Sequence, residues 1–286
     1  MTISHPTGAT HGPIVLSDET ANSQVTIAPA RGAIVTSFSV AGRELLYLDR
    51  ATFDDPSKNV RGGIPVLFPS PGKLANDEWR DAQGHTHVMK QHGFARNLPW
   101  MVEAAAQTSA SLLLMSDEST LAQYPAHFNA RLHVAVEGTA MRLGMQVHNT
   151  GDAPMQFGLG YHPYFLVNDK AGVRIDTDAT RVFDNVSRQT EAFTGFDFTR
   201  PEVDLHLLDQ SRSESRLTLA DGSAIVISAS AEFTYWVVWA IAGKPYVCLE
   251  PWTSPGNALN TQQRLVELPG GASHHYWVEI RYDAAG

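Results

Sequence analysis

Two residues with aromatic neighbours have side chains that can transfer protons. His162 lies in GLGYHPYF (158–165), and Glu250 lies in CLEPWTSPGNALN (248–260). An imidazole and a carboxylate act as general acid and general base when their surroundings bring their pKa values near neutral pH. The pair could therefore serve a reaction that takes one proton from a substrate and returns another. Each residue alone also has a structural interpretation, as a buried carboxylate paired with an arginine or as a satisfied structural histidine.

Two further segments, 59–74 (NVRGGIPVLFPSPGKL) and 91–100 (QHGFARNLPW), are rich in Gly, Pro, aromatic and polar residues. Loops of this kind on a rigid scaffold often carry binding sites. A polyhydroxylated ligand needs aromatic faces for its C–H surface and fixed donors and acceptors for its hydroxyl groups. The aromatic candidates are Trp252, Phe94, Phe165 and Trp100. The polar candidates are Arg61, Gln91, His92, Arg96 and Asn97. The arginines could instead be ordinary ion-pair partners.

The histidine-rich segment GHTHVMKQH (84–92) raises the question of a metal site, because His85 and His87 would share one face of a strand. No cysteine or close carboxylate completes a ligand set, so we predict no metal site. The sequence has no dinucleotide-binding glycine pattern, P-loop or nucleophile elbow, and we predict no cofactor. The single cysteine, Cys248, lies in an apolar run and is predicted to be a buried structural thiol.

Composition and charge exclude several classes of protein. Hydrophobic residues make up 43% and charged residues 18%, as in folded proteins. The net charge of -9 argues against a nucleic-acid partner, which requires a basic face. No apolar run reaches the ~18 residues of a membrane span, and the N-terminus does not resemble a secretory signal. We therefore expect a cytoplasmic protein that acts on a small molecule, as a monomer or weak homodimer.

Short strands must position these segments. The clearest hairpin is RLHVAVEGTAMRLGMQVHNTG (131–151), in which apolar residues alternate with polar ones on both sides of a Gly-Thr turn. Similar strands are predicted within 23–49, 216–230, 234–252 and 274–283. A short helix is predicted only within 116–128, with Ser116 as its N-cap and Pro125 as its stop.

This pattern predicts an all-β fold, a large antiparallel β-sandwich. The sequence contains no linker, repeat or low-complexity block, so we predict a single domain over residues 1–286. Residues 1–13 are small and polar and are predicted to form a loose lead-in.

Four motifs in order resemble the aldose 1-epimerase (galactose mutarotase-like) superfamily: VRGGIPVLFP, QHGFARNLPW, GLGYHPYF and LEPWTSPGNAL. The sequence is most similar to the branch that contains hexose-6-phosphate mutarotases, from about Gln24 to the end. The resemblance implies a supersandwich of large antiparallel sheets. It also implies an isomerase that interconverts the α and β anomers of an aldose by opening and closing the sugar ring.

The resemblance also assigns roles to particular residues. It implies that His162 is the acid, that Glu250 is the base and that His92 binds substrate hydroxyls. The residues implied to contact substrate or phosphate are Arg61, Gln91 and Arg96. A substrate-binding aspartate is expected in EVDLHLLD (202–209), as Asp204 or Asp209, and Asp204 is preferred. Trp252 is expected to provide an aromatic face.

For the acid–base pair we expect a nearby carboxylate to raise the pKa of His162, and burial beside Trp252 to raise that of Glu250. Two departures from the family leave the substrate open between a sugar phosphate and a free sugar. Lys73 stands where many relatives have arginine, and the segment 73–90 is longer than in the hexose-6-phosphate enzymes.

Two other functions remain open at this point. The same fold could bind a carbohydrate without converting it, although a pure binding protein has no need of both His162 and Glu250. A glycoside hydrolase or polysaccharide lyase is a third possibility. Glycoside hydrolysis normally requires two carboxylates at a defined separation, and Glu250 is the one convincing candidate in the sequence.

Overall fold

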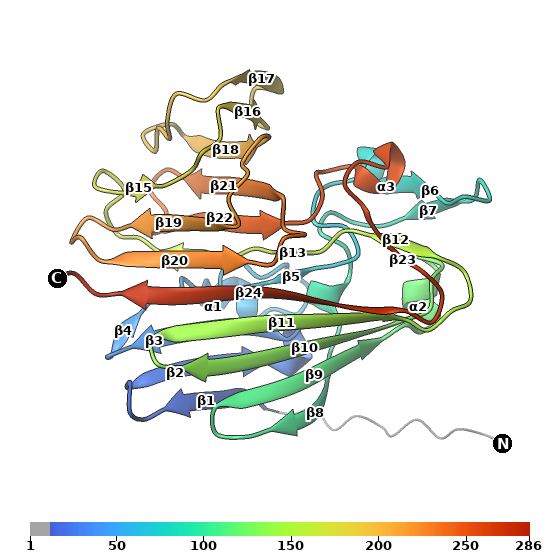
Figure 1. The fold of residues 1–286 in the computed structure, drawn as a ribbon, viewed down its shortest axis with the longest axis horizontal. Helices are drawn as coiled ribbons and strands as arrows, with labels where there is room; N and C mark the ends of the chain where they lie inside the picture. The colour runs from blue at the N-terminus through green and yellow to red at the C-terminus, as the bar shows by residue number, and fades with distance from the viewer. Residues whose placement is uncertain (1–11) are drawn as a thin grey trace.

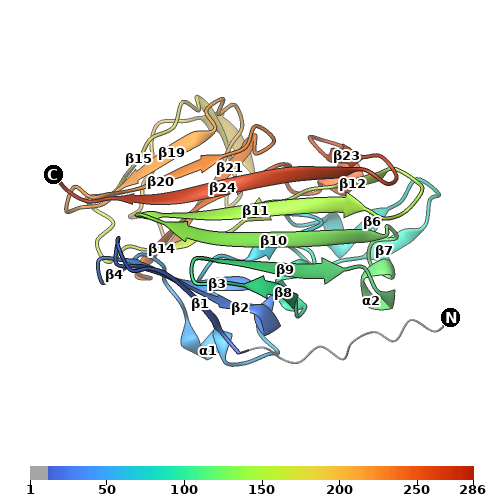
Figure 2. The same ribbon diagram turned by 60° about the horizontal axis from the view of Figure 1, so that its bottom comes forward.

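The computed structural model describes residues 12–286, so most of the predicted lead-in (1–13) lies outside the described residues. Two eight-stranded antiparallel sheets dominate the fold (Figures 1 and 2), which confirms the prediction of an all-β sandwich. The described helices are single turns: α1 (Arg50–Phe53), α2 (Glu118–Leu121) and α3 (Ala258–Thr261). Three 3-10 turns accompany them: Pro29–Arg31, Ala75–Asp77 and Ala95–Asn97.

The first large sheet, called here the long-strand sheet, contains the longest strands of the chain. Its order is β15 (Arg174–Ile175), β19 (Glu214–Thr218), β20 (Ala224–Ala229), β24 (Ser273–Asp283), β11 (Ala140–Asn149), β10 (Phe128–Glu137), β9 (Ser109–Met115) and β8 (Met101–Ala105). The predicted hairpin is β10 and β11, with Leu132 opposite Met145 and Val134 opposite Leu143. Alternating burial along both strands confirms its period of two.

The second large sheet, called here the cavity sheet, carries most of the candidate site. Its order is β17 (Gln189–Ala192), β16 (Arg181–Asp184), β18 (Glu202–Leu207), β21 (Tyr235–Ile241), β22 (Tyr246–Trp252), β13 (Gly160–Tyr161) and β5 (Val66–Leu67), with β14 (Tyr164–Leu166) also paired to β22. One face of this sheet packs into the interior through alternate residues such as Leu205, Val238 and Leu249, which are buried.

Both large sheets contribute to one continuous cluster of buried side chains. Val134, Leu143 and Ile280 enter it from the long-strand sheet, while Leu205 and Leu249 enter it from the cavity sheet. Full burial of such a side chain contributes roughly 1.5–3 kcal/mol to the free energy of unfolding. The shared core therefore fixes the two sheets relative to each other and gives the cavity sheet a rigid backing.

Three smaller sheets complete the fold. They are β1 (Ile14–Asp18), β2 (Ser23–Ala28), β3 (Ile34–Val40) and β4 (Arg43–Glu44); β12 (Met155–Phe157) with β23 (Val266–Leu268); and β6 (Glu78–Arg80) with β7 (Thr86–Val88). The β6–β7 hairpin occupies the long segment 73–90 and lies beside α3 (Figure 1), where Asn260 Nδ2 donates to the Glu78 carbonyl at 2.8 Å.

The predicted N-cap of α2 was wrong by one residue. Asp117, and not Ser116, caps the helix, because its carboxylate accepts from the Thr120 N–H at 2.9 Å while the Thr120 hydroxyl accepts from the Asp117 N–H at 2.8 Å. The Ser116 hydroxyl instead accepts from the Phe128 N–H. Among residues 12–286 no helix has the length and apolar character needed to cross a membrane.

Candidate active site

Alternate residues of β18, β21 and β22 face away from the core and form one wall of a cavity. Because successive side chains of a strand point to opposite faces, residues paired across the sheet share a face. The strand pairing produces three rows: Tyr235 and Trp252; His206, Val237 and Glu250; and Asp204, Trp239 and Cys248. Strand register alone therefore determines which side chains lie together on this wall.

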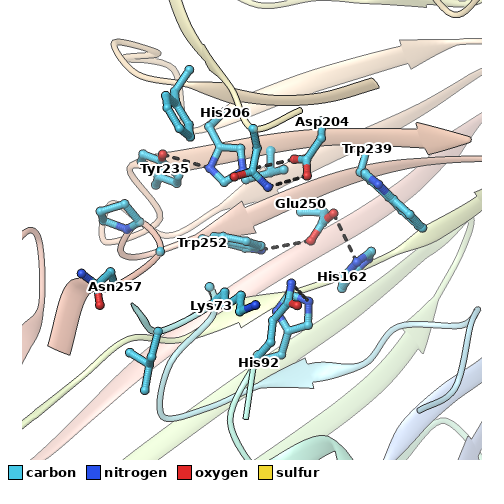
Figure 3. A pocket seen from close by; sticks show the side chains of 18 of the residues that line it. Lys73, His92, His162, Asp204, His206, Tyr235, Trp239, Glu250, Trp252 and Asn257 are labelled. Atoms are coloured by element: carbon cyan, nitrogen blue, oxygen red, sulfur yellow. Dashed lines mark hydrogen bonds and ion pairs between the residues drawn. The ribbon is translucent and has the colours of Figure 1, made fainter. Parts of the chain in front are cut away.

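The cavity has a volume of about 880 Å³, within the range of small-molecule sites. Its remaining walls come from loops, including Gly72–Asn76, Gln91 and His92, and Pro255–Asn257. Figure 3 shows Glu250 and His162 close together, with Trp252 beside Glu250 and Asp204 above it. The segments singled out in the sequence thus meet at one place.

His162 and Glu250 contact each other although they come from different strands. His162 lies between β13 and β14, and both strands pair with β22, which carries Glu250. The imidazole Nε2 lies 3.4 Å from Glu250 Oε1, and Trp252 Nε1 donates to Oε2 at 3.2 Å. The Tyr164 ring stacks on the imidazole, with centroids 4.6 Å apart and planes 7° from parallel. Both members of the pair are buried.

Burial shifts the pKa values of the pair in opposite directions. Desolvation, followed by the charge of Asp204, raises the pKa of Glu250 well above its usual value. Desolvation, with smaller effects from His92 and the nearby guanidinium groups, lowers the pKa of His162 well below its usual value. The expectation that a carboxylate neighbour would raise the pKa of His162 was therefore wrong, because loss of water outweighs that attraction. Both shifts favour the uncharged forms.

His92 is held at the cavity wall by its loop. Gly93 forms an isolated β-bridge with Phe68 and lies so close to it that a Cβ at residue 93 would be 2.1 Å from the Phe68 carbonyl oxygen, at a φ of +70°. The His92 Nδ1–H donates to the Pro71 carbonyl. The remaining nitrogen, Nε2, is then an acceptor, and it lies 3.2 Å from Gln91 Nε2. Burial lowers the pKa of His92 to about 3, so the ring is neutral.

The two predicted substrate-binding arginines have different positions. Arg61 lines the cavity, with its guanidinium carbon 5.5 Å from the centroid of the Trp239 ring. Arg96 does not line the cavity; it lies behind Gln91 and donates to the Gln91 carbonyl at 3.0 Å. Burial lowers the pKa of Arg96 to about 10. Lys73 also lines the cavity, on a segment tied to α3 by the 2.8 Å bond from the Asn257 N–H to the Lys73 carbonyl.

Asp204 lines the cavity, whereas Asp209 does not. The Asp209 carboxylate accepts from the Thr180 hydroxyl at 2.6 Å and from two backbone N–H groups in the same turn. The geometry therefore agrees with the preference for Asp204, which comes from the alternation of β18. Of the aromatic candidates, Trp252 lines the cavity, whereas Phe94, Phe165 and Trp100 are core residues.

Several polar and aromatic cavity residues were missed in the sequence. They include Trp239, Tyr235, His206, Asn185, Arg188 and Asn257. His206 could have been found, because in EVDLHL it lies two positions after Asp204 and so shares its face. Tyr235 and Trp239 could not, because TYWVVWAI is apolar throughout and shows no period.

A carboxylate does lie close to His85 and His87, although within residues 12–286 these side chains are not among the groups of potential metal ligands. The turn between β6 and β7 brings Asp81 Oδ2 to 2.8 Å from His87 Nε2 and 3.2 Å from His85 Nδ1. In the part of the chain that the structure describes, the group of potential metal ligands within 4.8 Å of one another is His162, Cys248 and Glu250. Cys248 is fully buried beneath the pair, and burial raises the pKa of its thiol.

Comparisons with curated proteins show similarity to two proteins that carry an epimerase name. Proteins of Cenchrus ciliaris and Escherichia coli that carry the provisional name glucose-6-phosphate 1-epimerase are each 31% identical to this chain. The matches cover 176 and 169 residues, 57% and 56% of this chain, and 50% and 51% of the relatives. The chain thus matches about half the length of these curated relatives.

Solved structures extend the likeness to the whole fold. The Synechocystis protein Slr1438 has a TM-score of 0.93 at 33% identity, covering 99% of both chains. A galactose mutarotase related enzyme from Lactobacillus acidophilus has a TM-score of 0.77 at 20% identity, covering 96% of this chain and 98% of the other, and shows the fold alone. A family model described as Aldose 1-epimerase matches residues 14–281. The chain therefore belongs to the aldose 1-epimerase family.

Proposed function

We propose that this protein is a mutarotase, an isomerase that interconverts the α and β anomers of a hexose or hexose 6-phosphate. The observation that carries the proposal is the buried 3.4 Å contact between His162 and Glu250 in a polar cavity. Family membership and the provisional names of the relatives support the same reaction.

The proposed reaction moves two protons at neighbouring atoms. Glu250 accepts the proton of the anomeric hydroxyl while His162 donates a proton to the ring oxygen, and the bond from C1 to that oxygen breaks. The aldehyde rotates about the C1–C2 bond, and the ring closes on its other face with both proton transfers reversed. Because both oxygens are bonded to C1 in the closed ring, acid and base must lie close together, as they do here.

One proton shared by the pair is enough for this cycle. Before ring opening the proton is on His162 and Glu250 is ionised; after ring opening it is on Glu250 and both side chains are neutral. Burial favours the neutral arrangement, and the short contact allows the proton to return to His162. General acid–base catalysis of this kind contributes ~10²–10⁴-fold to a rate.

Other cavity residues supply the contacts that hold the sugar. Asp204 accepts a hydrogen bond from one sugar hydroxyl; a second hydroxyl takes the place of the Gln91 amide as the donor to Nε2 of His92, and the Trp252 ring covers C–H surface. Gln91 lies beside His92 and offers an amide to the same hydroxyls. These roles are supported by the placement of all four residues at the cavity wall.

We further propose a modest preference for the phosphorylated sugar. Arg61 lines the cavity, and within residues 12–286 its guanidinium forms no ion pair, so its charge is available to an anion. The same holds for the Lys73 ammonium group in the described chain. Cationic groups of this kind form charge-assisted hydrogen bonds to phosphate, and guanidinium does so bidentately. Arg96 lies behind the wall and supports Gln91 instead.

Magnetisation-exchange NMR on α-glucose, α-galactose and glucose 6-phosphate tests the proposal. The wild type should accelerate exchange between anomers, and Glu250→Gln should not, whereas the exposed control Glu118→Gln should match the wild type. A methyl glucoside, which has no free anomeric hydroxyl, serves as a second substrate. Its cleavage would indicate a hydrolase, for which the cavity does hold a second carboxylate, Asp204. Sugar binding without exchange would indicate a carbohydrate-binding protein.

Three broader predictions remain proposals. A single domain is supported by the buried cluster shared between the two large sheets. A cytoplasmic location is supported by the one, fully buried cysteine. A monomer or weak homodimer is the proposed oligomeric state, which light scattering would measure directly.

A further inference from the structure

Five polar side chains form a continuous hydrogen-bonded chain along the cavity wall built by β16, β18 and β21 (Figure 3). The Tyr235 hydroxyl lies 3.0 Å from His206 Nδ1, and His206 Nε2 lies 3.2 Å from Asp204 Oδ1. Asn185 Nδ2 donates to Asp204 Oδ2 at 2.7 Å, and Arg188 Nη1 donates to Asn185 Oδ1 at 2.6 Å. Asp204 is therefore engaged through both oxygens.

Donor and acceptor chemistry fixes the direction of the bonds at Asp204. A carboxylate only accepts, so His206 Nε2 carries the proton that faces Asp204, and the Tyr235 hydroxyl is the partner of the other ring nitrogen, Nδ1. The amide of Asn185 is oriented in the same way, because its NH₂ faces Asp204 and its oxygen faces Arg188. Each carboxylate oxygen has a second lone pair, which remains available on the cavity side.

Packing prevents these side chains from turning. His206 is buried, with the rings of Phe183, Tyr235 and Trp252 edge-on to it at centroid distances of 5.9, 5.5 and 5.7 Å. Asn185 follows β16, and its backbone N–H donates to the Asp204 carbonyl at 2.8 Å. The rings around it thus hold His206, and the backbone bond to Asp204 holds Asn185 beside β18.

We propose that His206 and Asn185 are positioning residues, which hold the Asp204 carboxylate in the one orientation that receives a hydrogen bond from a sugar hydroxyl, while the Tyr235 hydroxyl holds the His206 ring in place through Nδ1. The inference rests on the proposed function and assigns no proton transfer to His206, because its Nε2–H is committed to Asp204. Carboxylate partners that fix a ring's tautomer and direction are a general device for orienting a functional group. Here the roles are reversed, and the ring orients the carboxylate.

The test compares two substitutions of the same histidine. His206→Phe keeps an aromatic ring at this position but removes both hydrogen bonds of the imidazole. It should raise KM for the sugar about tenfold, which is the effect of losing one charge-assisted hydrogen bond. The value of kcat should change less than threefold, because the hydroxyl contact is present in ground state and transition state alike. His206→Gln places an amide donor near the position of Nε2 and should restore most of the lost affinity. His133→Phe, at an exposed site on β10, is the control and should behave as the wild type.

A double-mutant cycle separates positioning from general loss of structure. If His206 acts through Asp204, His206→Phe should add little to KM in an Asp204→Asn background, whereas independent structural effects would add. Additive penalties, or a wild-type KM in an active His206→Phe enzyme, would overturn the proposal. If His206→Phe does not fold, Asn185→Ala and Tyr235→Phe replace it in the same double-mutant cycle with Asp204→Asn. If the wild type does not accelerate anomer exchange, the proposed function is contradicted and the positioning role is not. The double-mutant cycle then uses sugar affinity from calorimetry in place of KM.

Discussion

Nε2 of His162 lies 3.4 Å from Oε1 of Glu250, and both side chains are removed from water. An acid and a base in direct contact can exchange their proton without solvent, so the site can reset itself between the two halves of a ring-opening cycle. The Trp252 indole N–H donates to the other carboxylate oxygen, Oε2, at 3.2 Å, and so holds the carboxylate with Oε1 toward His162. The predictions below follow from this contact and from its surroundings.

Glu250→Gln and His162→Asn should each reduce anomer exchange by at least two orders of magnitude. Both replacements keep approximate size and polarity but cannot carry the proton of the pair. Sugar affinity should stay within about tenfold of the wild type, as measured by calorimetry, and thermal unfolding should check that the fold is intact. Full activity in either variant would remove that residue from the mechanism.

The dependence of kcat/KM on pH should show a broad plateau, corrected for the uncatalysed rate. The pair is active when it holds one proton, so activity falls when the pair gains a second proton at low pH or loses its one proton at high pH. The lowered pKa of His162 moves the acid limb to lower pH, and the raised pKa of Glu250 moves the alkaline limb to higher pH. Asp204→Asn removes a charge that raises the pKa of Glu250, so its alkaline limb should shift to lower pH. An alkaline limb that stays in place would contradict this electrostatic coupling.

Arg61→Ala should lower the affinity for glucose 6-phosphate by roughly 10–100-fold, because one or two charge-assisted hydrogen bonds are lost. The affinity for glucose should change far less. The affinity of the wild type for the phosphorylated sugar should also fall as salt rises. Arg96→Ala is the matched control. The Arg96 side chain donates to the Gln91 carbonyl and does not line the cavity, so its removal should lower the affinity for both sugars alike. Equal kinetics on both sugars, insensitive to salt and to Arg61, would favour the free aldose.

Exhaustive chelation should leave the exchange rate unchanged, because the proposed proton transfers need only the two side chains of the pair. Rates before and after dialysis against EDTA, with zinc added back, provide the measurement. The ligand cluster of His162, Cys248 and Glu250 makes the experiment informative. Loss of activity with EDTA and recovery with zinc would require a metal-assisted mechanism.

Gly93→Ala should lower the free energy of unfolding by more than about 1–3 kcal/mol, the range for strained backbone alone, because its Cβ would also collide with the Phe68 carbonyl. Gly84→Ala separates the two effects, since Gly84 also has a positive φ (+87°) but open space around it. In denaturant unfolding, the free energy of unfolding of Gly93→Ala should lie well below that of Gly84→Ala. Similar losses for the two variants would show that the close approach is relieved by movement of the loop.

The sequence located the cavity because its loops interrupt the alternation of the strands with Gly, Pro and aromatic residues. The β10–β11 hairpin and the choice of Asp204 over Asp209 followed from a period of two, which strand geometry imposes. Both the polar loop and the family resemblance predicted a substrate contact by Arg96. Its side chain lies in the 3-10 turn Ala95–Asn97, and the direction of that turn depends on the path of the backbone around it.

Contacts that depend on turns also could not be predicted. Asp81 reaches both His85 and His87 only because the β6–β7 turn folds back on itself. The lowered pKa of His162 likewise depends on how completely the surrounding rings exclude water, which residue spacing does not reveal. Local periodicity therefore predicts which face a side chain occupies, while depth and neighbours require the folded chain.

Along β18, β21 and β22, residues that touch the sugar cavity alternate with residues that fill the core. Exchanging Leu208 or Val237 for another side chain alters the shape offered to a ligand and leaves the packing behind the sheet unchanged. Inserting a single residue in β18 has the opposite effect, because every following side chain changes face: Leu205 would enter the cavity while His206 entered the core. Point substitutions in these strands can therefore reshape the cavity alone, whereas a change in strand length disturbs the cavity and the core together.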